Sequence, residues 1–206
     1  MEIKKEYSAA LGFPYIAYIP ERISDKPSII FQLHGAGERG NGDNLDDVNK
    51  YGLVNCADDD TLEDMILILP QCPAESFWVA HIESLKLFFD RCIQKYNADD
   101  KRIFLCGLSM GGFGTWYMAM AYPDMFRAIA PCCGGGMPWN AATLKMPVWA
   151  FHGKEDDVVN PHETYDMVEA LLKSGADVKY TYFDNVGHES WNLAFNRDLV
   201  YWFKNC

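Results

Sequence analysis

The sequence predicts an α/β fold in which a mostly parallel β-sheet is flanked by helices on both faces. Short apolar runs of the kind that form strands buried on both faces recur along the chain. Segments with the apolar spacing of amphipathic helices separate several of these runs. The chain has 206 residues, an ordinary size for one domain, and no linker, repeat or low-complexity tract divides it. We therefore expect a single domain over residues 1–206.

The strands are expected in the following order. Residues 7–19 alternate in polarity and end at Pro20, which predicts one or two strands at an antiparallel edge. Continuous apolar runs predict interior strands at 28–33, 65–69, 102–106, 126–130 and 148–151. Renewed alternation predicts a last strand at 178–183.

The helices are expected where apolar residues recur every three or four positions. Pro161, a favourable residue at a helix start, opens one of them. The predicted helices cover 82–96, 112–121, 162–173 and 191–203. No connection longer than about 15 residues is expected between elements, so we predict little or no lid.

Charge and composition restrict the class of partner. The formal net charge of −11 argues against a nucleic-acid partner and against an anionic membrane surface. No run approaches the roughly 18 apolar residues of a membrane span. The lysines near the N-terminus are not followed by the apolar core of a signal peptide. We expect a cytoplasmic protein that acts on a small molecule; its oligomeric state does not follow from the sequence.

The cysteines and histidines give no sign of a metal site. Seven cysteines, an odd number with no C-x-x-C pair, favour buried free thiols in a reducing compartment, although a disulfide between two of them stays open. The five histidines show no metal-ligand spacing. We expect neither a metal nor an organic cofactor.

A candidate nucleophile, Ser109, lies between a predicted strand and a predicted helix. The pentapeptide Gly107-Leu108-Ser109-Met110-Gly111 has the pattern G-x-S-x-G. Alone this pattern is weak, since a turn rich in small residues could produce it. Strand, sharp turn and helix are the context in which it presents a serine hydroxyl outward, with glycines where strand and helix pass closely.

A serine needs a base and an orienting acid to act as a nucleophile at neutral pH. His188, just after the last predicted strand, is the expected base. The other reading is a loop histidine bonded to backbone. Of the remaining histidines, His34 also ends a predicted strand, but its neighbours suit a different task. His152 begins a turn and is expected to be structural. His81 and His162 lie at or near predicted helix starts and are expected to face solvent.

The acid is expected in the loop after the strand at 148–151. Asp156 and Asp157 are both candidates there, and periodicity does not separate them. An aspartate in this loop could accept the second N–H of the imidazole and stabilise the imidazolium. Asp184 is a weaker candidate because it lies too close to His188 along the chain.

Backbone N–H groups are expected to stabilise the oxyanion of the tetrahedral intermediate. Met110 follows the serine at a helix N-terminus, and its N–H is one candidate. The second should come from the loop His34-Gly35-Ala36-Gly37, and we choose Ala36 by its position. A glycine-rich turn without a ligand is the alternative.

The chain resembles α/β-hydrolases of the compact bacterial esterase type, near dienelactone-hydrolase-like, polyhydroxybutyrate-depolymerase-like and feruloyl-esterase-like enzymes. The resemblance covers nearly the whole chain. It rests on LHGAGERG (33–40), GLSMGGFGTW (107–116), YPDMFRA (122–128), HGKEDDVV (152–159) and GHESW (187–191). In the pattern H-G-x-x-D of these enzymes the acid is the fourth residue after the histidine. The resemblance therefore selects Asp156 and supports His188. In these enzymes a proline often comes soon after the valines of this loop; here Asn160 intervenes before Pro161, a small departure from that pattern.

Three tryptophans could line a substrate pocket. Trp78, Trp139 and Trp191 fall in loops near the carboxyl ends of predicted strands, whereas Trp116 is expected to pack the helix after Ser109. For each loop tryptophan, plain packing is an equal alternative. An open cleft without a lid favours small or short acyl groups.

The leading functional hypothesis is a serine carboxylic ester hydrolase that acts through an acyl-enzyme, feruloyl and acetyl-carbohydrate esters included. Peptide or amide cleavage, as in relatives of prolyl peptidases, is the nearest alternative, but those enzymes usually carry an extra domain that restricts access. A non-catalytic binding protein and a cysteine hydrolase are disfavoured, because all three side-chain types are present and serine occupies the turn.

Overall fold

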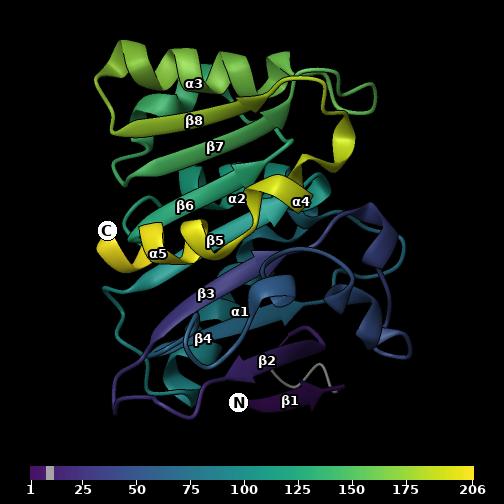
Figure 1. Ribbon diagram of the computed structural model, residues 1–206, viewed down its shortest axis with the longest axis vertical. Helices are drawn as coiled ribbons and strands as arrows, with labels where there is room; N and C mark the ends of the chain where they lie inside the picture. The colour runs from purple at the N-terminus through teal and green to yellow at the C-terminus, as the bar shows by residue number, and fades with distance from the viewer. Residues whose placement is uncertain (8–11) are drawn as a thin grey trace.

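The computed structural model describes residues 1–7 and 12–206 (Figure 1). Within them, eight strands form one sheet in the order β1-β2-β4-β3-β5-β6-β7-β8. The edge strands β1 and β2 run antiparallel to their neighbours, and all other neighbouring strands are parallel. Their bounds are β1 (Glu2–Glu6), β2 (Tyr15–Ile19), β3 (Ser28–Leu33), β4 (Met65–Pro70), β5 (Ile103–Leu108), β6 (Ala128–Cys132), β7 (Val148–Gly153) and β8 (Val178–Phe183).

Helices cover both faces of this sheet, as the sequence predicts (Figure 1). On one face lie α1 (Ile82–Lys95), α2 (Met110–Ala121) and α3 (His162–Ser174). The other face is covered by α4 (Trp191–Ala194), α5 (Arg197–Asn205) and short 3-10 turns. The predicted fold class, a mostly parallel sheet with helices on both faces, is confirmed.

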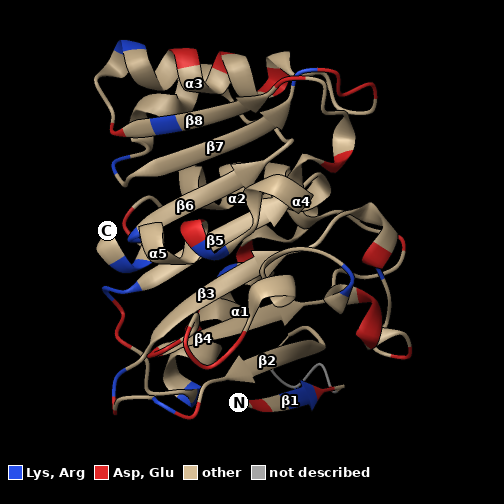
Figure 2. Ribbon diagram, in the orientation of Figure 1, with Lys and Arg blue, Asp and Glu red and all other residues tan. Residues whose placement is uncertain are grey.

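Burial on both faces explains the continuous apolar runs. In β5, Ile103 and Leu105 pack toward α1 and α2, while Phe104 and Cys106 pack toward α5. Alternate residues of one strand therefore enter two separate cores. Charged side chains lie mainly on the outer helices and loops, as Figure 2 shows.

Most predicted elements are found within two residues of their expected bounds, and the bounds of three of them need correction. The strand expected at 126–130 is β6, two residues later, because Ala128 is the residue that pairs with Phe104 of β5. The helix expected at 191–203 is two helices: Asn196 is extended and caps α5, its side chain accepting from the N–H groups of Asp198 and Leu199. The edge expected at 7–19 includes β2, but β1 precedes that range, and residues 8–11 lie outside the described part of the chain.

The connection between β3 and β4 is longer than expected. It holds three 3-10 turns, η2 (Ala36–Glu38), η3 (Leu45–Asn49) and η4 (Leu53–Cys56). Leu45, Val48 and Leu53 are buried against the sheet. The segment therefore completes the core on that face instead of forming a lid.

No helix among the described residues is long and apolar enough to cross a membrane.

Candidate active site

A tight turn between β5 and α2 presents Ser109. The serine has φ 53° and ψ −117°, a conformation that costs energy for a residue with a side chain. A Cβ on Gly111 would lie 2.0 Å from the carbonyl oxygen of Leu33, and one on Gly107 would lie 2.2 Å from the oxygen of Gly111. Glycine is therefore required on both sides of the serine, as the G-x-S-x-G pattern predicts.

Ser109, His188 and Asp156 form a hydrogen-bonded chain. His188 Nε2 lies 2.9 Å from Ser109 Oγ, and His188 Nδ1 lies 2.7 Å from Asp156 Oδ2. The serine follows β5, the aspartate follows β7, and the histidine begins the short 3-10 turn after β8. Since parallel strands end at one edge of the sheet, residues 79 positions apart meet there.

The two other candidate acids lie elsewhere. Asp157 is exposed, next to Asp156 along the chain but outside its hydrogen bonds. Asp184 accepts a hydrogen bond from Lys154 at 2.6 Å. The geometry thus favours Asp156, in agreement with the H-G-x-x-D pattern.

Asp156 is held as a carboxylate. Burial opposes its charge, but hydrogen bonds from His188 and from the N–H groups of Val159 and Val158 outweigh burial and lower the pKa of Asp156 below its ordinary value. The two backbone groups donate to Oδ1 at 2.9 Å each. An ionised Asp156 can therefore accept the Nδ1–H of His188 and leave Nε2 free to take the serine proton.

The loop that carries Ala36 is fixed by a buried histidine. His34 Nδ1 donates to the carbonyl oxygen of Gly35 at 2.6 Å, and His34 Nε2 accepts from the N–H of Cys72 at 2.9 Å. Trp78 Nε1 donates to the carbonyl oxygen of His34 at 3.0 Å. The Gly35 carbonyl and the Ala36 N–H belong to one planar peptide unit and point opposite ways. Fixing the carbonyl therefore fixes the direction of the N–H.

This arrangement requires His34 to be neutral, because Nε2 must accept a hydrogen bond. Burial lowers the pKa of His34 to about 4. Met110, the second expected oxyanion residue, is the first residue of α2, where the N–H has no partner inside the helix.

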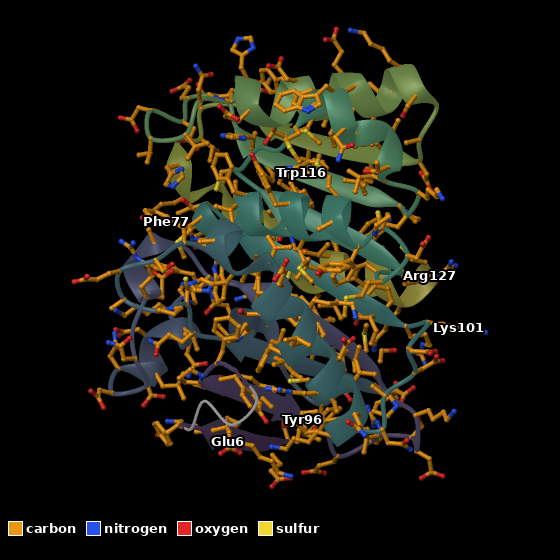
Figure 3. All side chains as sticks on the ribbon, turned by 180° about the vertical axis from the view of Figure 1, so that it is seen from behind. Glu6, Phe77, Tyr96, Lys101, Trp116 and Arg127 are labelled. Atoms are coloured by element: carbon orange, nitrogen blue, oxygen red, sulfur yellow. The ribbon has the colours of Figure 1, made fainter. Side chains whose placement is uncertain are left out.

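An apolar cavity of about 430 Å³ opens beside Met110. Its lining residues are Phe77, Trp78, Val79, Met110, Phe113 and Tyr117. In Figure 3, Phe77 lies on the opposite side of the molecule from Lys101 and Arg127, which precede β5 and β6. The cavity is thus at the edge where the parallel strands end.

The three candidate pocket tryptophans are placed differently. Trp78 lines this cavity. Trp191 is 7 % exposed, and its ring stands perpendicular to the His188 ring with centroids 5.1 Å apart. Trp139 is 82 % exposed and is not among the lining residues.

Sequence reasoning did not identify four of the residues that line the cavity: Phe77, Val79, Phe113 and Tyr117. Phe113 and Tyr117 are spaced four apart on α2, a helical spacing that places both on one face next to Ser109. That spacing was the available signal.

One group of described residues has the donor atoms of a metal site. The ligand atoms of Cys133, Asp156 and His188 lie within 4.8 Å of one another. Asp156 and His188 are already bonded to each other, and burial raises the pKa of the Cys133 thiol well above its ordinary value. The expectation that no metal is needed stays a prediction. The same thiol is poorly suited to act as a nucleophile, because the thiolate is the reactive form.

This fold, with serine, aspartate and histidine at the ends of β5, β7 and β8, defines the class of α/β-hydrolases. Residues 82–198, more than half of the chain, match the dienelactone hydrolase family. The protein belongs to that family.

Similar proteins include several esterases. A bifunctional acetylxylan esterase/xylanase of Neocallimastix patriciarum is 27 % identical over 188 residues, which are 85 % of this chain and 25 % of that protein. Feruloyl esterase B of Neurospora crassa is 32 % identical over 135 residues, 57 % of this chain and 42 % of that protein. The chain thus spans less than half the length of these two relatives.

Solved structures agree on the fold. A thermostable esterase superposes with a TM-score of 0.81 at 26 % identity, covering 99 % of this chain and 62 % of that one. The acetyl xylan esterase of Aspergillus awamori gives a TM-score of 0.76 at 15 % identity, with both chains covered completely.

The His34 interaction predicts a dependence of stability on pH. The pKa of His34 is about 4 in the fold and 6.5 as a reference, so the unfolded chain binds the extra proton first as pH falls. The contribution is complete above pH 6.5 and is lost between about pH 6.5 and 4; it should reach roughly 2–3 kcal/mol. Urea unfolding of wild type and His34→Gln at pH 7.5 and 4.5 measures it. The variant, which has no such group, should lose less stability on acidification; equal losses would contradict this account.

Substituting Asp156 and Asp157 one at a time tests which of them is the acid that orients His188. Asp156→Asn should lower kcat by roughly 10⁴, because the amide favours the wrong imidazole tautomer. Asp157→Asn should change kcat by less than about twofold, as expected for a solvent-exposed carboxylate. Ester turnover of both variants, compared at equal active-site concentration, decides between them. A larger effect at Asp157 would reassign the acid.

Proposed function

We propose that this protein hydrolyses carboxylic esters through a covalent acyl-enzyme on Ser109. The observation that carries the proposal is the chain of hydrogen bonds from Ser109 Oγ through His188 to the buried Asp156. A hydroxyl in contact with an imidazole whose other nitrogen is bonded to a carboxylate is an activated nucleophile. The esterase relatives support the same reaction.

The reaction follows from these contacts. His188 Nε2 removes the hydroxyl proton as Ser109 Oγ bonds to the ester carbonyl carbon, and the carbonyl oxygen takes the negative charge. The N–H groups of Met110 and Ala36 are proposed to hold this oxyanion. The imidazolium returns the proton to the alcohol oxygen as the C–O bond breaks. Water, deprotonated by His188, then releases the acid and regenerates the serine.

The apolar cavity supports a small-molecule ester with a short or compact acyl or alcohol group. A volume of about 430 Å³ is at the lower end of what small-ligand sites offer. Four of its six lining residues are aromatic, and all six lie on the segment 77–79 or on α2. A feruloyl or acetyl-carbohydrate ester is a second candidate, favoured by the aromatic rings of Phe77, Trp78, Phe113 and Tyr117.

We infer a cytoplasmic setting from the thiols, since all seven cysteines are free and five of them are buried. The acidic charge supports action without a nucleic-acid or membrane partner. The proposed reaction calls for no cofactor.

Replacing Ser109 by alanine tests the proposal directly. Ser109→Ala should lower kcat for p-nitrophenyl esters by on the order of 10⁴ to 10⁶, because no acyl-enzyme can form. Thermal unfolding should change little. Mass spectrometry of wild type treated with an aryl phosphonate should place the adduct on Ser109. Retention of a tenth of the wild-type turnover would remove Ser109 from the mechanism.

The dependence of the rate on acyl length tests the substrate class, and chelation tests whether the reaction needs a metal. Rates with p-nitrophenyl esters should rise only until the acyl chain fills the cavity, because a methylene left in water forgoes about 0.8 kcal/mol of transfer free energy. EDTA should leave kcat/KM unchanged. A preference for chains of about twelve carbons or more would reveal an apolar groove beyond the described cavity. Activity lost on chelation and restored by a divalent ion would contradict the serine mechanism.

A further inference from the structure

A second histidine contacts the same carboxylate oxygen as His188. His152 Nε2 lies 3.1 Å from Asp156 Oδ2, and His188 Nδ1 lies 2.7 Å from that oxygen. His152 is a residue of β7 and is completely buried, in the interior of the fold behind the carboxylate. The sequence indicated a structural role for it at the start of a turn, and the ester hydrolysis described above makes no use of it.

The contacts of His152 fix which ring nitrogen carries a hydrogen. Nε2 faces two acceptors, Asp156 Oδ2 at 3.1 Å and the carbonyl oxygen of Val159 at 3.0 Å. A lone pair at Nε2 would face two oxygens without a hydrogen between them. Nε2 must therefore be protonated, and His152 donates toward the carboxylate.

The other ring nitrogen holds the ring in place. Nδ1 lies 2.7 Å from Thr164 Oγ1, and that hydroxyl lies 2.7 Å from the carbonyl oxygen of Gly134. Thr164 is on α3, and Gly134 follows β6. With Nε2 protonated and the ring neutral, Nδ1 accepts from the Thr164 hydroxyl, whose single hydrogen is then not available to the Gly134 carbonyl. The ring is thus tied to α3 and cannot turn away from Asp156 without losing this bond.

We propose that His152 is a positioning residue for the proposed ester hydrolysis, one that holds Asp156 Oδ2 with its Nε2–H and limits how strongly Asp156 attracts the proton of His188. This inference rests on the proposed function. With Oδ1 bonded to two backbone N–H groups and Oδ2 bonded to two imidazoles, the carboxylate has four donors and a single orientation. His188 consequently meets the carboxylate at one angle only.

The expected effect on pH dependence has a definite sign. Removing the donor from Oδ2 concentrates negative charge on the side that faces His188, so the imidazolium form of His188 is stabilised. The acid limb of the kcat/KM profile, where His188 must lose its proton to act as a base, should then move to higher pH. The titratable groups around the carboxylate are His152 from β7, His188 after β8 and the thiol of Cys133 after β6; α3 contributes the hydroxyl of Thr164.

Two substitutions of His152 separate positioning from packing. The amide nitrogen of glutamine reaches the place of Nε2, whereas the amide of asparagine reaches only the place of Nδ1. His152→Gln keeps a donor for Asp156, and His152→Asn keeps a partner for Thr164 but leaves Asp156 without that donor. Both variants lose the ring, so both should be destabilised to a similar extent.

The experiment compares kcat/KM from pH 4.5 to 9 for a p-nitrophenyl ester in wild type and in both variants, at active-site concentrations set by phosphonate titration. We expect His152→Asn to lower kcat roughly ten- to hundredfold, the effect of losing a hydrogen bond to a charged group. Its acid limb should move to higher pH. His152→Gln should recover most of kcat and keep the wild-type acid limb. Thermal unfolding midpoints report the packing cost of each substitution.

The outcomes distinguish the two proposals. A wild-type protein that turns over no ester and takes up no phosphonate would overturn the proposed function. Normal wild-type turnover with variants that lose activity equally, or that keep the wild-type acid limb alike, would overturn the role of His152 alone. If His152→Asn does not fold, His152→Gln still decides: a wild-type acid limb and near-normal kcat support the donor, and a shifted limb with low kcat contradicts it.

Discussion

The close approach of backbones beneath Ser109 is the constraint on which the rest of the site depends. The start of α2 touches the ends of two strands: a Cβ on Gly111 would meet Leu33 of β3, and one on Gly112 would come within 2.3 Å of the carbonyl oxygen of Cys132 of β6. This contact brings the N-terminus of α2 beside the loop that carries Ala36. The turn that carries the proposed nucleophile and the N–H of Met110 is thereby placed by backbone packing, and the side chain of His34 fixes the direction of the Ala36 N–H.

The proposed acid is placed by a different means. Asp156 is buried, and burying a carboxylate is costly unless its oxygens are bonded. Here the N–H groups of Val158 and Val159 and the rings of His152 and His188 satisfy it. The favourable interactions outweigh the desolvation and keep the pKa of Asp156 low. A charge that is ionised before substrate arrives needs no reorganisation when the imidazolium forms.

The sequence predicted the order of elements and proposed Ser109 and His188 as site residues because both inferences follow local rules. Apolar runs mark buried strands, and a nucleophile turn needs glycines at fixed places. Where several chain segments must meet, the sequence was less informative. Periodicity did not separate Asp156 from Asp157, which only the resemblance and the geometry distinguish. The role proposed for His152 depends on its contacts with Asp156 and with Thr164, which lies twelve residues away along the chain on α3. The helix breaks at Asn196 because the side chain of this residue caps α5, accepting from two backbone N–H groups. The apolar repeat in the sequence does not reveal such a cap.

The residues of the candidate site are spread along the chain, so they are synthesised in a fixed order. The loop after β3 lies in the first half of the 206 residues and the serine turn after β5 lies just past their midpoint, whereas His188 follows β8, the last of the described strands and an edge of the sheet (Figure 1). A chain emerging during synthesis carries Ser109, the proposed nucleophile, before it carries His188, the proposed base. In the proposed mechanism Ser109 has its hydrogen-bonded base only where the segment after β8, which pairs with β7, is in place. A nascent chain that lacks the segment after β8 would therefore carry the proposed nucleophile without the base that acylation needs.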